Sequence, residues 1–384
     1  MQRHLLVVFV NLCRFLLAAT FLFSGFVKAV DPMGMSIKLQ AYFTHWHILL
    51  REEGLMLTAL AIFLAVAEFM LGVYLFLGMR RKFASIATFI VMLAMTALTV
   101  YIYIYSPVTD CGCFGDAIKL TNGETLLKNI ILLGAATLVL CFPQHMRRLV
   151  SERNQWLTSI VAIIYIISLA LYSRHYLPAL DFSPYKVGTD IRASREGKLG
   201  EKAFEDFANL WMMGKGDIDM VDSLLNDTGY TFLLVSPNLQ TADDGISDRI
   251  NDLHDLCADT RIHLYMLTAS DSMAIGHWID RTGAAYPFLL GEKEQISTMA
   301  HSNPGLLLLK DGRIFGKWSA NNLPAEEGFS QALQPHSSDM SKEISKLAII
   351  FFVPLFFVIF ADNIWVGSKY FKRHRQRRRR HSQS

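Results

Sequence analysis

Charged residues are scarce in this chain, and their scarcity excludes an ordinary soluble protein. Asp, Glu, Lys and Arg make up 18% of the 384 residues, whereas hydrophobic residues make up 52% and gather in blocks. One helical crossing of a bilayer core of roughly 30 Å needs about 20 mostly apolar residues. Six segments meet this requirement and predict membrane-spanning helices: 5–29, 55–77, 84–105, 126–142, 156–172 and 347–366. The first run is longer than the apolar core of a signal peptide and other spans follow it, so we expect it to be retained.

Cysteine is also scarce, which limits the redox chemistry that the chain can perform alone. Only two of the five cysteines lie close together, in segment 110–115 (Asp-Cys-Gly-Cys-Phe-Gly) between the third and fourth spans. The other three are isolated, and we expect two apolar fillers and one buried structural thiol: Cys13, Cys141 and Cys257. A membrane oxidase that passes electrons from thiols to a quinone needs a second cysteine pair on the same side. Any electron relay must therefore include a partner protein or a small molecule.

Basic residues outside the spans predict the orientation of the chain. They concentrate in segments 80–82, 147–153 and 369–380, which lie on one side of the membrane if the six spans alternate. Because Lys and Arg are enriched in cytoplasmic loops, we expect both termini to be cytoplasmic. The first outside loop (30–54) and residues 178–343 are then periplasmic. These features predict a multi-pass protein of the cell inner membrane.

The C-terminal tail is the most basic segment of the chain. Residues 369–380 contain eight Lys or Arg, more than enough to account for the net charge of +3. Such a polybasic segment beside a span predicts binding to anionic lipid. No folded element accompanies these charges, so we expect no nucleic-acid partner.

Spans and loops divide the chain into four expected domains. Residues 1–150 form a four-span membrane domain, 151–177 a fifth span, 178–343 an extracytoplasmic domain, and 344–384 the sixth span with its tail. The sequence contains no internal repeat and no paired broken helices, which makes a transporter the weaker alternative.

Strand-like and helix-like segments alternate between residues 229 and 320. Short β-rich runs predict five strands, at 231–236, 262–267, 287–290, 306–309 and 313–318. Apolar residues at helical spacing predict helices at 246–256, 272–281 and 295–301. Segment 310–312 (Lys-Asp-Gly) predicts a tight hairpin between the last two strands. This βαβαβ pattern predicts an α/β sandwich with a central sheet.

The order of these elements resembles the thioredoxin fold over about 90 residues. The resemblance implies a proline before the final hairpin, and Pro304 lies there, so we expect a cis peptide bond. Thioredoxins carry Cys-x-x-Cys after the first of these strands, whereas residues 236–241 (Ser-Pro-Asn-Leu-Gln-Thr) contain no cysteine. A degenerate thioredoxin-like module that binds or scaffolds is therefore expected. The predicted fold class is a mainly α membrane protein: a four-helix transmembrane bundle, with two further spans flanking an α/β thioredoxin-like domain.

Two short motifs accompany the cysteines in the membrane domain. The first span ends in residues 24–28 (Ser-Gly-Phe-Val-Lys), and the second contains residues 68–72 (Glu-Phe-Met-Leu-Gly). Together with Cys-Gly-Cys between spans three and four, they resemble the MauE/DoxX family of four-helix, redox-associated membrane proteins across residues 5–142. The cysteine motif points to the MauE side. The resemblance implies a role in extracytoplasmic thiol–disulfide handling or in maturation of exported redox proteins.

Cys111 and Cys113 are the candidate redox residues. The predicted topology places them on the side of the membrane where disulfides persist. Two residues of extended chain span at most about 7 Å, whereas disulfide Cα atoms usually lie about 4.4–6.8 Å apart, so a bridge needs a curled backbone. The two glycines of the motif permit the necessary dihedral angles. Strain in so small a ring favours exchange, while a structural bridge and a soft-metal site with Asp110 or Asp116 stay open as alternatives.

Glu68 and Arg14 are the second pair of candidates, because ionisable side chains inside a membrane are costly and often functional. At 1.5 Å per residue, Glu68 lies about 15 Å and Arg14 about 14 Å from the cytoplasmic edge. We therefore expect an ion pair between spans one and two. Such a pair locks the register of the helices or couples a proton or ligand to function, and both interpretations stay open.

The sequence therefore predicts a membrane protein that exchanges disulfides with an extracytoplasmic redox partner or client protein, or that helps exported redox proteins to mature. A non-enzymatic membrane scaffold or assembly protein, whose cysteines are structural, is the alternative. The lipid bilayer is a partner in either case, and the sequence identifies neither a cofactor nor the client.

Overall fold

The computed structural model describes residues 2–48, 53–106, 111–334 and 339–381; of residues 2, 3, 53, 366, 367 and 369–381 only the backbone is described. The chain is mostly helical and divides into two compact units. The first comprises Met1–Ala170 and Ile344–Ser384, and the second comprises Leu171–Glu343. The finer division into four domains stays a prediction.

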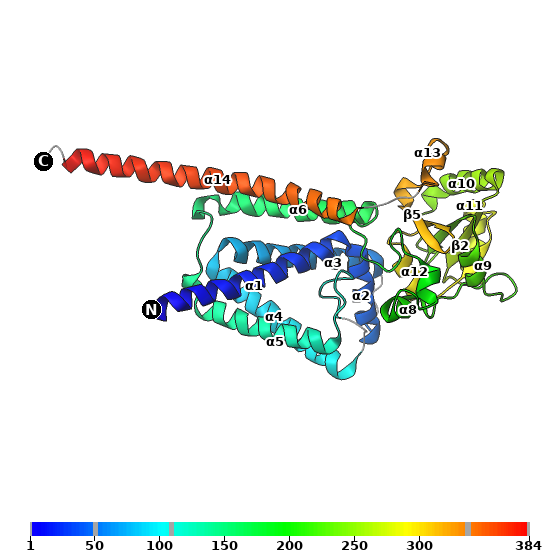
Figure 1. The fold of residues 1–384 in the computed structure, drawn as a ribbon, viewed down its shortest axis with the longest axis horizontal. Helices are drawn as coiled ribbons and strands as arrows, with labels where there is room; N and C mark the ends of the chain where they lie inside the picture. Colours follow the sequence, from blue (N-terminus) through cyan, green and yellow to red (C-terminus); the bar gives the residue numbers. More distant parts are fainter. Residues whose placement is uncertain (1, 49–52, 107–110, 335–338, 382–384) are drawn as a thin grey trace. The chain divides into compact units, whose positions relative to one another are not determined.

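Six long apolar helices dominate the first unit (Figure 1). They are α1 (Gln2–Val30), α3 (Glu53–Leu77), α4 (Arg81–Tyr105), α5 (Asn122–Cys141), α6 (Gln155–His175) and α14 (Met340–His381). Each contains a segment long and apolar enough to cross a membrane, which confirms the six predicted spans. Large apolar side chains such as Phe63 and Phe356 are exposed on their outer surfaces, as lipid-facing positions require. The chain is a multi-pass membrane protein.

A further helix, α2 (Pro32–His45), occupies much of the segment that the sequence predicts to be the first outside loop. Its start is encoded locally: the Asp31 carboxylate accepts the amide hydrogen of Gly34 at 2.8 Å, and Pro32 occupies the first helical position. The helix buries Met35 and Tyr42. It therefore packs against the membrane helices rather than extending away from them.

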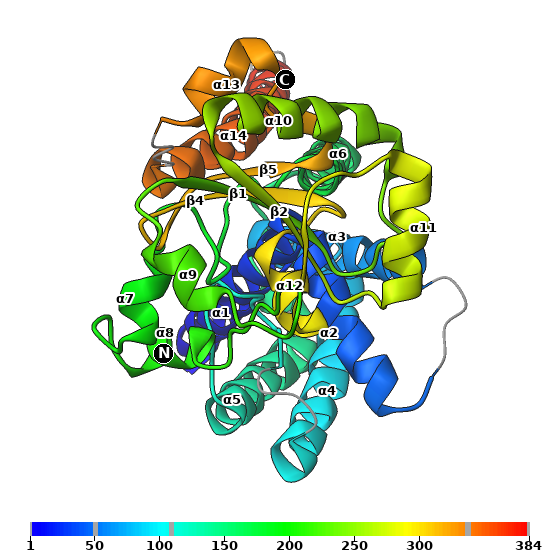
Figure 2. The same ribbon diagram turned by 90° about the vertical axis from the view of Figure 1, so that its right-hand side faces the viewer.

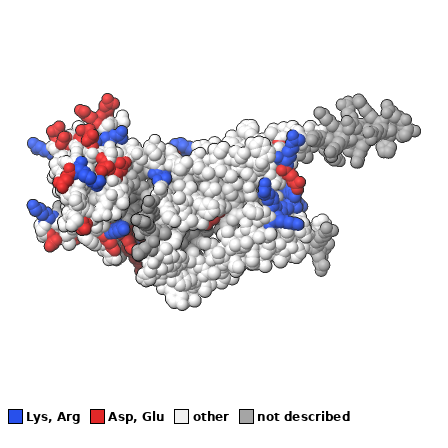
Figure 3. Space-filling view, turned by 180° about the vertical axis from the view of Figure 1, so that it is seen from behind, with Lys and Arg blue, Asp and Glu red and all other residues white. Residues whose placement is uncertain are grey.

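The basic loops of the first unit lie together. Arg80, Arg81 and Lys82 line one groove with Gln144 and Arg148, so the turn after α3 meets the segment after α5. On the face in Figure 3, Lys and Arg side chains gather at one end of the helices, whose middle is almost free of charge. This common basic end is what the predicted topology requires; the cytoplasmic orientation itself stays a prediction. The side chains of the tail lie outside the described residues, and so does the predicted lipid contact.

Helices α6 and α14 run side by side and contact α3 (Figure 1). Phe69 of α3 packs against Tyr165 of α6 and Phe351 of α14, with ring centroids 5.9 and 5.2 Å away. Near the other end of α14, the buried Asp362 carboxylate accepts hydrogens from the amide and hydroxyl of Ser151 and from Asn154, at 2.5–2.7 Å. Asp362 therefore ties α14 to the turn that precedes α6.

The described residues of the second unit form one mixed five-stranded sheet. Its strands are β1 (Tyr230–Ser236), β2 (His263–Thr268), β3 (Phe288–Leu290), β4 (Gly305–Lys310) and β5 (Arg313–Ser319), in the order β3-β2-β1-β4-β5. β1, β2 and β3 are parallel, whereas β4 is antiparallel to both β1 and β5. All five predicted strands and the predicted hairpin are confirmed. The Asn303–Pro304 bond is cis, as expected.

Helices cover both faces of this sheet (Figure 2). On one face lie α10 (Ser247–Thr260), α11 (Ser272–Thr282) and α13 (Glu326–Ala332); on the other lie α7 (Ile191–Arg195), α8 (Glu201–Phe207), α9 (Val221–Asn226) and α12 (Lys293–Met299). Short 3₁₀ helices also occur in both units: η1 (Pro143–His145) and η2 (Glu152–Asn154) in the first, and η3 (Asp244–Ile246) and η4 (Ala320–Asn322) in the second. Successive residues of β1, such as Phe232 and Leu233, enter opposite cores, as the two-residue period of a strand dictates.

The three isolated cysteines lie in elements other than the Cys-Gly-Cys turn. Cys257 of α10 is buried in the core between this helix and the sheet, and burial raises its pKa to about 12, so it matches the predicted structural thiol. Cys13 is half-buried in α1, and Cys141 is exposed on the surface of α5. After β1, where thioredoxins carry cysteines, the Asn303 side chain instead bonds Ser236 and the carbonyl of Asn238. This segment is a hydrogen-bonded turn without a thiol.

Candidate functional site

Two glycines set the packing of α1 against α3. A Cβ atom on Gly25 would lie 2.4 Å from the amide nitrogen of Phe69, and one on Gly72 would lie 2.6 Å from that of Leu22. Only glycine lets two helix backbones approach so closely. Because the helices are antiparallel, this register brings the residues beside Gly25 level with Glu68. The Ser-Gly and Glu-x-x-x-Gly motifs therefore belong to one contact.

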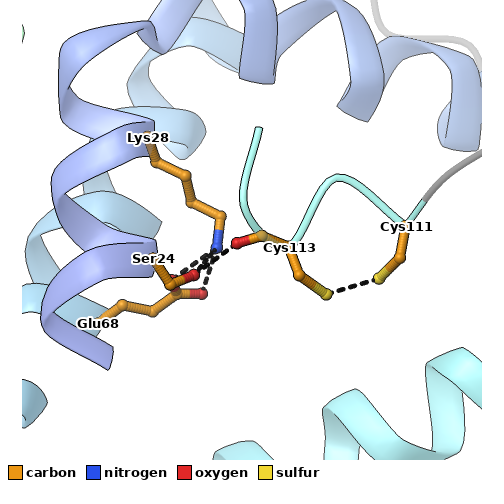
Figure 4. Close-up of polar contacts among 5 residues, drawn as sticks. All are labelled: Ser24, Lys28, Glu68, Cys111 and Cys113. Atoms are coloured by element: carbon orange, nitrogen blue, oxygen red, sulfur yellow. Dashed lines mark hydrogen bonds and ion pairs between the residues drawn. The ribbon is translucent and has the colours of Figure 1, made fainter. Parts of the chain in front are cut away.

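At this contact, Glu68 forms a compact polar cluster with Lys28 and Ser24 (Figure 4). The Lys28 ammonium lies 2.7 Å from Oε1 and 2.6 Å from Oε2 of Glu68, and it donates to the Ser24 hydroxyl at 2.9 Å. Lys28 is only 3% exposed. A buried charge needs such close partners, because the loss of hydration costs several kcal/mol per ion. The ion pair therefore holds the two helices in one register.

The predicted ion pair between Glu68 and Arg14 is wrong. Arg14 is fully buried, and its guanidinium donates to the carbonyl oxygens of Arg147 and Phe76. The sequence-based estimate of depth assumed that residue 5 of α1 and Gly78 after α3 lie at the same depth in the membrane. In the structure, Arg14 lies beside Gly78 instead. Lys28 was the missed partner. It lies four residues after Ser24, on the same face of α1, and this spacing was the available signal.

The thiol pair lies in a tight turn before α5. Gly112 and Gly115 both adopt positive φ, at 68° and 54°, and the Gly115 amide donates to the Gly112 carbonyl at 3.1 Å. The expected role of these glycines in curling the backbone is confirmed. The turn brings the Sγ atoms of Cys111 and Cys113 within 2.8 Å. Cys111 is 7% exposed, whereas Cys113 is only partly buried.

Contacts from α1 and α2 hold this turn. The Ser24 hydroxyl lies 2.6 Å from the Cys113 carbonyl oxygen, and the Tyr42 hydroxyl donates to the Cys111 carbonyl at 3.3 Å. Lys38 pairs with Asp116 at 3.0 Å. The turn therefore joins the polar cluster, so Glu68 and the two cysteines, which the sequence singled out separately, lie together, while Arg14 lies elsewhere.

A small cavity of about 30 Å³ lies between the cluster and the turn. Glu68 and Cys113 both line it, together with Lys128 and Asn129 of α5 and apolar side chains of α4. A cavity of this size holds one or two water molecules but not a quinone ring. The Lys128 ammonium lies 4.1 Å above the Phe114 ring and directs a positive charge toward the thiols.

These surroundings move the pKa values of the two thiols in opposite directions. The hydrogen bond from Cys111 lowers the pKa of Cys113 to about 7, and the positive charges of Lys128 and Lys28 act in the same direction against burial and Glu68. The same hydrogen bond and burial raise the pKa of Cys111. One thiol of the pair therefore ionises near neutral pH, and the thiolate is the nucleophilic form of cysteine.

The metal alternative finds little geometric support. Asp116, one of the two proposed ligands, is engaged by Lys38, and Asp110 lies outside the described residues. Within the described part of the chain, no three His, Cys, Asp or Glu side chains are grouped as a metal site requires.

Comparison with known proteins identifies the segment that carries this site. No curated protein and no solved structure matches the chain significantly. A family model does match, and it covers about a third of the chain. The segment that contains Ser24, Lys28, Glu68 and both cysteines, residues 6–142, is similar to the family described as methylamine utilisation protein MauE.

Proposed function

We propose that this protein exchanges disulfides with an extracytoplasmic client or redox partner through Cys111 and Cys113, in the maturation of exported redox proteins. The observation that carries the proposal is the contact between the two Sγ atoms, with one thiol ionised near neutral pH. The similarity of residues 6–142 to MauE supports a membrane role in redox or cofactor maturation.

Cys113 is the attacking residue and Cys111 the resolving one. The Cys113 thiolate attacks a client disulfide, a mixed disulfide forms, and the second client sulfur leaves as a thiolate. Cys111 then loses its proton and attacks Cys113 Sγ, which releases the first client sulfur. The client gains two electrons and two protons, one proton from Cys111 and one from water. A partner with a dithiol reduces the new Cys111–Cys113 bridge, and the same steps run in reverse when the client is oxidised.

The second unit serves this exchange as a docking module in the proposal. Its sheet order, β3-β2-β1-β4-β5, is compatible with a degenerate thioredoxin-like domain. Cys257 is its one cysteine among the described residues, and it is buried. We therefore assign to Leu171–Glu343 the binding of the partner in the periplasm, and no electron transfer.

Trapping tests the proposal. A Cys111→Ser variant keeps the Cys113 nucleophile but cannot resolve the mixed disulfide, so we expect it to accumulate covalent adducts that a reductant releases. The matched Cys113→Ser variant lacks the nucleophile and is expected to trap far less. If neither variant forms adducts with any protein, while Cys113 in the native protein reacts readily with iodoacetamide, exchange with a client is excluded.

A membrane scaffold with structural cysteines is the second candidate. It is favoured by the low exposure of Cys111 and by the packing of the turn under Lys38 and Tyr42. Titration with glutathione separates the two functions. An exchanging pair interconverts between thiol and disulfide within the physiological range of potentials, whereas a structural bridge resists reduction.

A further inference from the structure

The Ser24 hydroxyl occupies an unusual position between two hydrogen-bond acceptors. Its Oγ atom lies 2.7 Å from Glu68 Oε2 and 2.6 Å from the Cys113 carbonyl oxygen, and it accepts a hydrogen from Lys28 at 2.9 Å. A hydroxyl carries only one hydrogen to donate. The membrane ion pair and the redox turn therefore compete for the same hydrogen of Ser24.

The Lys28 ammonium decides this competition. Its three hydrogens are matched by Oε1 and Oε2 of Glu68 and by Ser24 Oγ. Both carboxylate oxygens are thus already supplied with a hydrogen. The hydrogen of Ser24 is free to bond the Cys113 carbonyl, which carries no charge and receives nothing from Lys28.

The direction of the Cys113 backbone follows from this bond. Figure 4 shows the Cys113 carbonyl pointing into the cluster and its side chain pointing away, toward Cys111. A carbonyl held in place limits rotation of the adjoining backbone. It thereby keeps Cys113 Sγ within 2.8 Å of Cys111 Sγ and beside the cavity that Lys128 lines.

We infer that Ser24, held by the Lys28–Glu68 ion pair, is a positioning residue that anchors the Cys113 backbone for thiol exchange. The inference rests on the proposed function. The ion pair contributes geometry rather than net charge at the thiol, because Lys28 favours the Cys113 thiolate and Glu68 opposes it. The close approach at Gly25 is what lets one hydroxyl reach both partners.

The test measures the rate at which iodoacetamide alkylates Cys113 in the full-length protein in detergent, from pH 5 to 10. Mass spectrometry of the peptide that contains Cys113 reports how much of it has been alkylated. Ser24→Ala removes the anchor and leaves the ion pair in place. One lost hydrogen bond is worth about 1 kcal/mol, so we expect alkylation at pH 7 to slow roughly three- to tenfold, with the profile moved to higher pH.

Thr20 offers a matched control on the same helix. Its hydroxyl bonds the Leu16 carbonyl within α1 at 3.0 Å, and its side chain lines the same cavity. Thr20→Ala is expected to keep the native rate and profile, and Ser24→Thr, which returns a hydroxyl, is expected to restore them. If Ser24→Ala folds and matches Thr20→Ala throughout the pH range, the positioning role is excluded.

A second variant covers the case in which Ser24→Ala does not fold. The double variant Lys28→Met/Glu68→Gln removes both charges together and leaves the Ser24 hydroxyl beside the Cys113 carbonyl. We expect it to slow alkylation at pH 7 roughly three- to tenfold, as the loss of the anchor does, because the ion pair that holds Ser24 is gone, and a native rate would overturn the inference. Alkylation involves no client, so these results do not depend on trapping. If client proteins are trapped but Ser24→Ala is alkylated at the native rate, the inference about Ser24 is refuted and the exchange function stands. If no client is trapped but Ser24→Ala is alkylated more slowly, the exchange function is refuted and the inference about Ser24 stands.

Discussion

Cys113 illustrates how neighbours, more than the residue type itself, determine chemistry at the residue scale. Its sulfur receives a hydrogen bond from Cys111, and two lysines from different helices, Lys28 and Lys128, add positive charge. A cysteine without these neighbours would be mostly protonated at neutral pH. The pair Cys111–Cys113 was visible in the sequence, but the asymmetry between the two thiols comes first from the hydrogen bond between them, which only the folded turn provides.

Removing Cys111 tests this asymmetry. In Cys111→Ala, the largest cause of the lowered Cys113 pKa is lost, so the midpoint of the alkylation profile is expected to rise from about 7 toward the ordinary value of 9.0. At pH 7 the thiolate fraction then falls roughly tenfold or more, and above pH 9 the variant and native rates converge. Cys257, with a pKa raised to about 12, provides the internal control and should stay unmodified at pH 8. An unchanged midpoint would show that Cys111 does not stabilise the thiolate.

At the scale of elements, the contact between α1 and α3 positions the polar cluster of Ser24, Lys28 and Glu68. Gly25 and Gly72 bring the backbones together, and Lys28 then meets Glu68 across the contact. Arg14, at the other end of the same helix pair, bonds loop carbonyls instead. A shift of one helical turn between the helices would separate Ser24 from Glu68.

Gly25→Ala is expected to destabilise this contact. Its new Cβ would meet the backbone of Phe69 and Ala65 at 2.4–2.8 Å, so the helices must separate, at a cost of about 1–3 kcal/mol. Gly134→Ala in α5 is the control, because nothing lies within 4 Å of its Cβ position. Thermal unfolding in detergent measures both variants. Equal melting temperatures for the two would mean that the close approach of α1 and α3 does not stabilise the protein.

Asp362→Ala tests the connection between α14 and the turn before α6. The change leaves the Ser151 amide, the Ser151 hydroxyl and Asn154 without their buried acceptor, and we expect a loss of about 1–3 kcal/mol. Asn363→Ala removes the exposed neighbouring side chain and should be nearly neutral. Limited proteolysis of the 143–155 segment, compared between the two variants, reports the release of α14. Identical cleavage patterns would contradict the role assigned to Asp362.

At the scale of the whole molecule, the distribution of charge predicts how the chain is oriented in the membrane. The basic loops after α3 and α5 lie at one end of the helices, and the polybasic segment 369–380 forms the C-terminal part of α14. Positive charge is retained on the cytoplasmic side. The predicted topology therefore places Leu171–Glu343 in the periplasm, on the same side as the Cys-Gly-Cys turn.

Labelling of introduced cysteines tests this topology. Met273 in α11 is 73% exposed, and Leu149 beside the basic groove is 40% exposed. We expect a membrane-impermeant maleimide to modify Met273→Cys in intact spheroplasts, and Leu149→Cys only after lysis, with each peptide identified by mass spectrometry. The reverse pattern would invert the topology and place the thiol pair in the cytoplasm, where disulfides rarely persist.

The sequence by itself determined the six spans, the strands of the second unit and the curled Cys-Gly-Cys turn. Each depends on local information: hydrophobic length, the two-residue or 3.6-residue period, and glycine at positive φ. Helix α2 also has a local start signal at Asp31 and Pro32, which hydrophobic length alone does not reveal. The finer domain boundaries, the orientation and the thioredoxin-like relationship stay predictions.

Only the tertiary structure decided that Lys28, and not Arg14, is the partner of Glu68, and that Ser24 joins this ion pair to Cys113. The depth of a residue in the membrane follows from its position in its own helix, whereas the partner of its side chain depends on the register between two helices. That register is set by backbone contacts at Gly25 and Gly72, where α1 and α3 touch, and residues 40 positions apart in the chain meet there.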